Sequence, residues 1–200
     1  MNSKRAVLIV SLTLLTLIGI LFIYDSPVSS THNLNAPSLQ ASFTALSNAN
    51  SDVCIFGINE TENFLDSMPY GSYIQGSCCN YMDYNAYAKQ IDGLKQYSNI
   101  SEIPQDPYNV SVALVKQMVS YWNATLTANQ NATLTKALAI TSQMGGDSGY
   151  CCCECWAWYF HEGLLKYLIL NYNLNAGNLG NILYLEDCCG GPLGSAGFNA

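Results

Sequence analysis

Eight of the nine cysteines stand in three groups of close neighbours, and these groups constrain the fold more than any other feature. The groups are Cys78-Cys79, Cys151-Cys152-Cys153 with Cys155, and Cys188-Cys189. Adjacent cysteines seldom bond to each other, because the small ring strains the preferred disulfide dihedral angle. Each group therefore needs sulfur atoms or an ion from elsewhere, and we expect the fold to bring these distant segments together at one end of its helices.

One interpretation of the groups is a site for a soft metal ion such as Zn²⁺ or Cu(I), both of which bind thiolates. Four thiols within five residues are more than a disulfide scaffold requires. Cys152 and Cys155 form a C-x-x-C motif, and Cys151 and Cys155 would share one face of a helix. The predicted ligands are Cys78, Cys79, Cys151, Cys152, Cys155, Cys188 and Cys189.

Two other interpretations stay open. In an exported protein the same cysteines would be oxidised to at most four disulfides with one thiol left over, giving a stapled structural or interaction domain. Alternatively, Cys152 and Cys155 would exchange disulfides with a substrate, with Cys152 as the attacking thiol. A thioredoxin-type motif belongs beside a βαβ pattern, which is missing here. We therefore favour metal binding and expect a binding protein rather than an enzyme.

The N-terminal residues resemble an export signal. Residues 6–24 form a mainly apolar run of nineteen without a charge, preceded by Lys4-Arg5 and followed by Asp25. A membrane-spanning helix needs about 20 apolar residues, and basic residues stay on the cytoplasmic side. We expect residues 1–24 to anchor the chain in the cell membrane with its domain outside the cytoplasm. Cleavage near Val28 and Ser30 would instead release a secreted protein.

Composition supports export and excludes one class of partner. Five Asn-x-Ser/Thr sequons, at Asn59, Asn99, Asn109, Asn123 and Asn131, predict a glycoprotein. After Tyr24 the chain has five lysines, no arginine and fourteen acidic residues, a formal charge of −9. Nucleic-acid binding depends on lysine and arginine contacts to phosphate, so it is excluded. The partners that remain are a soft metal ion or a protein of the cell envelope, with the membrane contacted only through the N-terminal helix.

Apolar spacing predicts an all-α fold, a small bundle of about five helices. Residues 25–52 are rich in Ser, Asn, Ala and Thr and are expected to form a flexible stalk. Residues 53–190 form the cysteine-rich domain, and residues 191–200 are a Gly-rich tail. The predicted helices are about 80–97, one capped by Asn109, one opened by a Thr127–Gln130 capping box, about 151–171, and about 176–185.

Two residues of the predicted fourth helix are ambiguous. His161 would point away from the face that carries Cys151 and Cys155, so we interpret it as a core or surface histidine. Glu162 falls among apolar residues and must be paired, protonated, bound to a metal or solvated at the edge of the helix. Glu186-Asp187 precede the last cysteines and either add oxygen ligands to a site or form a solvated turn.

Overall fold

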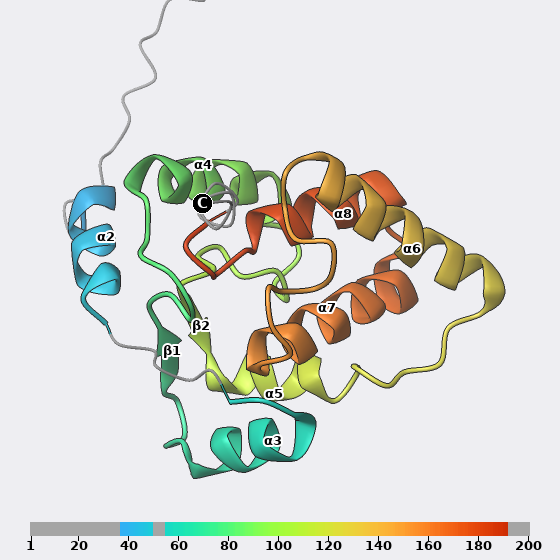
Figure 1. Cartoon of the computed structure of the whole chain (residues 1–200), viewed down its shortest axis with the longest axis horizontal. Helices are drawn as coiled ribbons and strands as arrows, with labels where there is room; N and C mark the ends of the chain where they lie inside the picture. The colour runs from blue at the N-terminus through green and yellow to red at the C-terminus, as the bar shows by residue number, and fades with distance from the viewer. Residues whose placement is uncertain (1–36, 50–54, 192–200) are drawn as a thin grey trace, which may run out of the picture. The chain divides into compact units, whose positions relative to one another are not determined.

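In the computed structural model, residues 37–49 and 55–191 are described. This part of the chain forms seven α-helices, one short 3₁₀ helix and two short strands (Figure 1). In chain order they are α2 (Leu39–Ser47), α3 (Ile58–Ser67), β1 (Tyr73–Gln75), α4 (Tyr84–Leu94), η1 (Lys95–Tyr97), β2 (Asn109–Ser111), α5 (Val112–Val119), α6 (Ala128–Gln143), α7 (Trp156–Tyr172) and α8 (Ala176–Leu185). The domain is therefore mainly helical.

Three of the predicted helices are confirmed in position. Helix α4 with η1 covers most of residues 80–97 and begins at Asp83, whose side chain accepts a hydrogen bond from Ala86 N. Helix α6 opens with the predicted capping box, in which the Thr127 and Gln130 side chains each bond to the other's backbone. Helix α8 spans Ala176–Leu185, as the spacing of its apolar residues predicts.

Helix α2 occupies part of the segment that we expected to be a flexible stalk. Ser38 caps it through a hydrogen bond from Ala41 N. Leu39, Phe43 and Leu46 recur at helical spacing, and the Phe43 ring lies 5.2 Å from that of Tyr84 in α4. The composition of the segment did not reveal this helix, because its apolar face consists of only three residues. Helix α3 was likewise not predicted.

The predicted helical fold is confirmed in part, because the described residues are mostly helical but also include two short strands that were not predicted. Strands β1 and β2 pair in antiparallel register, with Ile74 opposite Val110. Each strand has only three residues, too few to show an alternating pattern, and the two are far apart in the chain. Because Asn109 lies in β2, the cap of α5 is Ser111, whose side chain accepts a hydrogen bond from Leu114 N.

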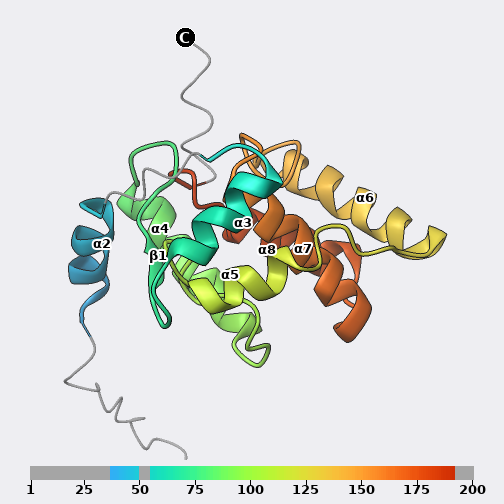
Figure 2. The same ribbon diagram turned by 90° about the horizontal axis from the view of Figure 1, so that it is seen from below.

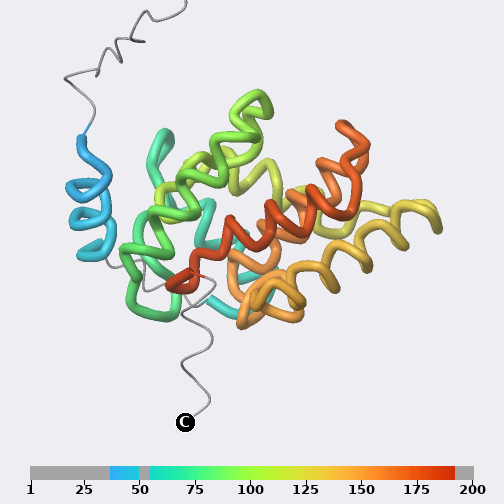
Figure 3. The backbone as a smooth tube through the Cα atoms, turned by 90° about the horizontal axis from the view of Figure 1, so that it is seen from above, coloured from blue at the N-terminus to red at the C-terminus, as the bar shows by residue number. Residues whose placement is uncertain are grey.

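Two close helix pairs build the core, and a glycine allows each contact. Helices α5 and α7 pack together, as do α6 and α8, which lie side by side in Figure 3. A Cβ atom on Gly163 of α7 would lie 1.9 Å from Met118 O, and one on Gly180 of α8 would lie 2.8 Å from Ala137 O. Helix α3 packs across α5 and α7 (Figure 2). These pairs fix the N-terminus of α7 and the C-terminus of α8, where two cysteine groups lie.

The predicted membrane anchor (residues 1–24), much of the predicted stalk and residues 192–200 of the Gly-rich tail lie outside the described residues. Among the helices of the described segments, none has the length and apolar character needed to cross a membrane.

Candidate metal centre

The three cysteine groups lie in three loops that are hydrogen-bonded to one another. Cys78 N and the Ser77 hydroxyl both donate to Cys188 O, each at 3.1 Å. On the other side of the loop after α8, the side-chain amide of Gln90 donates to Leu185 O and Asp187 O at 2.9 and 2.7 Å. Helix α4 and the loop before it therefore position Cys188 and Cys189.

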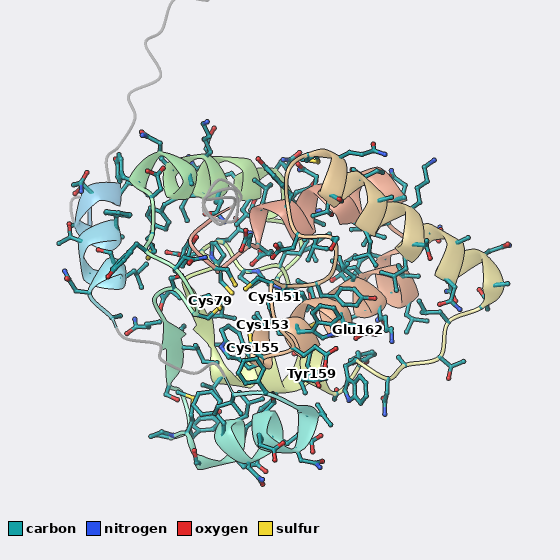
Figure 4. All side chains as sticks on the ribbon, in the orientation of Figure 1. Cys79, Cys151, Cys153, Cys155, Tyr159 and Glu162 are labelled. Atoms are coloured by element: carbon teal, nitrogen blue, oxygen red, sulfur yellow. The ribbon has the colours of Figure 1, made fainter. Side chains whose placement is uncertain are left out.

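The third loop, residues 151–155, precedes helix α7 (Figure 4). The predicted start of this helix at Cys151 is wrong, because Cys155 is its N-cap and the helix begins at Trp156. Cys155 N donates to Cys153 O at 2.9 Å, and Glu154 O accepts from Gly57 N at 3.2 Å. A loop over residues 151–155 thus takes the place of the first helical turn, and Cys151 and Cys155 do not share a helix face.

All eight described cysteines converge, as both the metal and the disulfide interpretations require. The Sγ atom of Cys189 lies 2.9 Å from that of Cys78, 3.1 Å from that of Cys151 and 3.4 Å from that of Cys152. The Sγ atom of Cys79 lies 3.4 Å from that of Cys152. A disulfide bond is about 2.05 Å long, and none of the eight forms one with another of them.

Four sets of three sulfur atoms lie within 4.8 Å of one another, close enough to hold a metal ion. They are Cys78/Cys79/Cys189, Cys78/Cys151/Cys155, Cys79/Cys152/Cys153 and Cys151/Cys152/Cys189. These sets contain every predicted ligand except Cys188, whose thiol interacts with those of Cys78 and Cys189.

Cys153 joins the cluster, although it was not among the predicted ligands. The ligands predicted from this loop were Cys151, Cys152 and Cys155. In a loop, neighbouring side chains point in different directions. The run of three consecutive cysteines was therefore the sequence feature that could have indicated Cys153 as a ligand. The same geometry separates Cys152 from Cys155, which share none of the four sets. The C-x-x-C motif is therefore not a pair of neighbouring thiols.

Contacts among the sulfur atoms shift the pKa values of their thiols in both directions. Hydrogen bonds from Cys151 lower the pKa of the Cys152 and Cys155 thiols, and one from Cys189 lowers that of Cys188. Conversely, the contact with Cys151 raises the pKa of Cys78. At Cys155 the backbone N–H of Ala157, at the start of α7, also lowers the pKa. Part of the cluster is therefore stabilised as thiolate, the form that binds metals.

One buried and one half-buried acidic side chain lie beside the cluster. Glu186 is 1% exposed, and neither of its carboxylate oxygens has a hydrogen-bond partner among the described residues. Burial raises its pKa well above the ordinary value, and the nearby Cys188 adds to the rise. Asp187 accepts from Cys189 N at 2.8 Å, and burial raises its pKa to about 7. Glu186 and Asp187 therefore do not form a solvated turn, which was one of the two interpretations of this segment.

The protein supplies little positive charge to balance these groups. No arginine lies in the described segments, and four of their five lysines are exposed. The fifth, Lys166, pairs with Glu162 at 2.8 Å. Glu162 is therefore paired rather than bound in the cluster, and it lies further along α7, away from the labelled cysteines (Figure 4).

His161 is a buried core residue, as expected, but it is also close enough to the cluster to act on its charge. Its Nδ1 atom lies 2.7 Å from Tyr150 O, a backbone carbonyl oxygen that only accepts, so Nδ1 carries the proton. Hydrogen bonds from Cys189 and Cys78 lower the pKa of the Cys188 thiol, and the imidazole of His161 lowers it further through charge.

A cavity of about 400 Å³ opens beside the exposed edge of the cluster. It is lined by the end of α2 and by residues 77–82, which include Cys78 and Cys79. Cys79 and Cys152 are exposed, whereas Cys78 and Cys151 are buried. An ion would thus reach the exposed sulfur atoms first.

These observations define a cysteine-rich helical domain whose clustered thiols are able to bind a metal ion. Comparison with known proteins adds no functional assignment: no family model, no curated protein and no solved structure matches this chain.

Proposed function

We propose that this protein binds a soft metal ion, Zn²⁺ or Cu(I), through its clustered cysteine thiolates. The observation that carries the proposal is the convergence of eight sulfur atoms from three loops. A Zn–S bond is about 2.3 Å long, so tetrahedral sulfur ligands lie about 3.8 Å apart. The Sγ atom of Cys153 lies 3.7 Å from that of Cys79 and 3.9 Å from that of Cys152.

Charge supports metal binding as well. Some thiols of the cluster are stabilised as thiolates, and the described residues place only His161 close by as a source of positive charge. Buried charges need partners, so cations would offset these groups. Bound ions would also keep the thiols from oxidation outside the cytoplasm.

The competing function is a disulfide-stapled structural or interaction domain. Disulfides pair sulfur atoms one to one, whereas the Cys189 sulfur is nearly equidistant from those of Cys78 and Cys151. A sulfur atom with two near neighbours is better suited to binding a shared metal ion than to forming one disulfide. We therefore place the stapled domain second.

The same experiment tests both functions. The full-length protein is purified without oxygen, its metal content is measured by elemental analysis, and its free thiols are counted after denaturation. Stoichiometric soft metal with most of the nine thiols free is expected. One free thiol without metal would overturn the proposal. Cys151→Ser should lower the bound metal, whereas Ser148→Ala, an exposed position in the adjoining loop, should not.

We also propose that the domain is held outside the cytoplasm by residues 1–24. The apolar segment and its basic flank support this, and the five sequon asparagines are all exposed. The expected result is a domain that added protease digests in intact cells. Mass spectrometry of the tryptic peptides would show which sequons carry glycans. Complete protection from the protease in intact cells, lost on lysis, would contradict export.

A further inference from the structure

The paired arrangement of the cysteines divides the cluster into two halves. Two of the three adjacent pairs contribute one buried and one exposed thiol, since neighbouring side chains point in different directions, whereas Cys188 and Cys189 are both buried. Cys78 is buried and Cys79 exposed, and Cys151 is buried and Cys152 exposed. These two cysteine pairs therefore divide the cluster into a buried half and an exposed half.

Of the four sulfur sets, two have no member in common. One consists of Cys78, Cys151 and Cys155, all buried, and the other of Cys79, Cys152 and Cys153, which are exposed or half-buried. A single tetrahedral ion uses four ligands, so one ion would leave half of the eight thiols unused. Two disjoint sets are what two ions require.

Cys189, in the last doublet, supplies the fourth ligand to each half. Cys189 lies 3.4 Å from Cys152 in the exposed set. Its sulfur also lies 2.9 and 3.1 Å from those of Cys78 and Cys151, so it stands between the two halves.

We infer that the cluster holds two divalent soft ions in two adjoining four-thiolate sites. The inner ion is bound by Cys78, Cys151 and Cys155, and the outer ion by Cys79, Cys152 and Cys153. The Cys189 thiolate is shared between the two ions and is the fourth ligand of each. This inference rests on the proposed function and adds the number of ions and the ligands of each. The outer ion exchanges with solvent through the cavity beside Cys79, while the inner ion is retained.

Cadmium(II), a spectroscopic substitute for Zn²⁺, is the probe for the test. The metal-free, full-length protein is titrated with ¹¹³Cd(II) without oxygen, and the ¹¹³Cd NMR spectrum is recorded. We expect binding to end at two equivalents with two all-thiolate resonances, and coupling between them through Cys189. A chelator should then remove one ion at least 10-fold faster than the other. A single equivalent, or one resonance and one release phase, overturns the inference.

A variant of the outer site separates this inference from the proposed function. Cys79→Ser/Cys152→Ser changes two exposed thiols and should retain one slowly released ion, whereas Ser148→Ala should retain both. Loss of both ions from the folded double variant, judged by circular dichroism, overturns the two-site arrangement while leaving metal binding intact. Failure of the wild-type protein to bind any Cd(II) overturns the proposed function itself.

Discussion

The Gln90 side chain of helix α4 donates a hydrogen bond of 2.7 Å to the backbone oxygen of Asp187, which directly precedes the last cysteine pair. Gln90 is 1% exposed, and its amide also donates to Leu185 O. A helix distant in sequence thereby holds the loop that carries Cys188 and Cys189. Gln90 is thus a positioning residue for the cluster.

Replacing Gln90 with leucine should loosen this loop. Gln90→Leu removes the side-chain donor of Leu185 O and leaves Asp187 O with the Tyr108 hydroxyl at 3.2 Å, so the free energy of unfolding should fall by about 2 kcal/mol. Metal affinity should fall 10- to 100-fold, as is typical when a group that orients a ligand is lost. Urea denaturation and competition with a chelator measure the two effects. Gln96→Leu, at an exposed position of the following turn, should change neither.

The contact between α5 and α7 should not tolerate a methyl group. In Gly163→Ala the new Cβ atom would meet the backbone oxygen of Met118, which can move only if the helices separate. We expect the free energy of unfolding in urea to fall by about 3 kcal/mol or more. The matched change Gly177→Ala, at an exposed position near the start of α8, should be neutral or stabilise by up to about 1 kcal/mol. Equal effects of the two substitutions would contradict the close packing.

The ion pair of α7 should show strong coupling. Lys166 binds both the Glu162 carboxylate and Trp122 O, and the two charged side chains are 12% and 17% exposed. Lys166→Met would leave Glu162 with little solvent and no partner, which should cost about 2–3 kcal/mol of stability. Glu162→Gln/Lys166→Met should cost less than the sum of the single substitutions. Additive effects in this double-mutant cycle would show that the pair contributes nothing.

Stability of the metal-free protein should depend on pH through Asp106. Burial raises the pKa of its carboxyl group, and the hydrogen bond that Tyr87 donates to it at 2.8 Å opposes the rise. Because the folded-state pKa is above the unfolded-state value, the unfolded chain loses this proton first as pH rises. The free energy of unfolding therefore falls between the two pKa values, by at most about 1.4 kcal/mol per pH unit for one proton.

Two variants at this pair should change the slope in opposite directions. Asp106→Asn removes the titrating group, so the free energy of unfolding should fall less steeply as pH rises above the ordinary pKa of aspartate. Tyr87→Phe removes the opposing hydrogen bond and should make the fall steeper. Asp187 and Glu186 contribute a slope of the same sign in every variant. Urea denaturation at each pH gives the slopes, and identical slopes for both variants would contradict this assignment.

Local sequence signals were sufficient where a helix carries its own cap and apolar face. The capping box of α6 and the spacing in α8 involve only neighbouring residues, and both helices lie where the sequence predicts them. The strands could not be predicted, because Ile74 and Val110 are paired by the surrounding packing rather than by a local pattern. The start of α7 was misplaced because apolar spacing does not distinguish the cysteine loop from a first helical turn.

The convergence of the cysteines could be expected from their grouping alone, but their division could not. Helical spacing suggested that Cys151 and Cys155 act together, which is observed, although both lie outside the helix. The role of Cys153 and the separation of Cys152 from Cys155 depend on the loop backbone. Likewise, the burial of Glu186 follows from the packing of the turn after α8, which apolar periodicity does not reveal.

The position of Cys189 among three other sulfur atoms also determines what happens when the protein is handled in air. Eight thiols can be joined in 105 ways, and a sulfur with several equally near neighbours selects none of them. Exposure to oxygen after loss of the ions should therefore yield a mixture of cross-linked isomers rather than one product. Such a mixture would not return to the native form when metal is added back. The disulfides found in a preparation would therefore show whether it had been exposed to oxygen without metal.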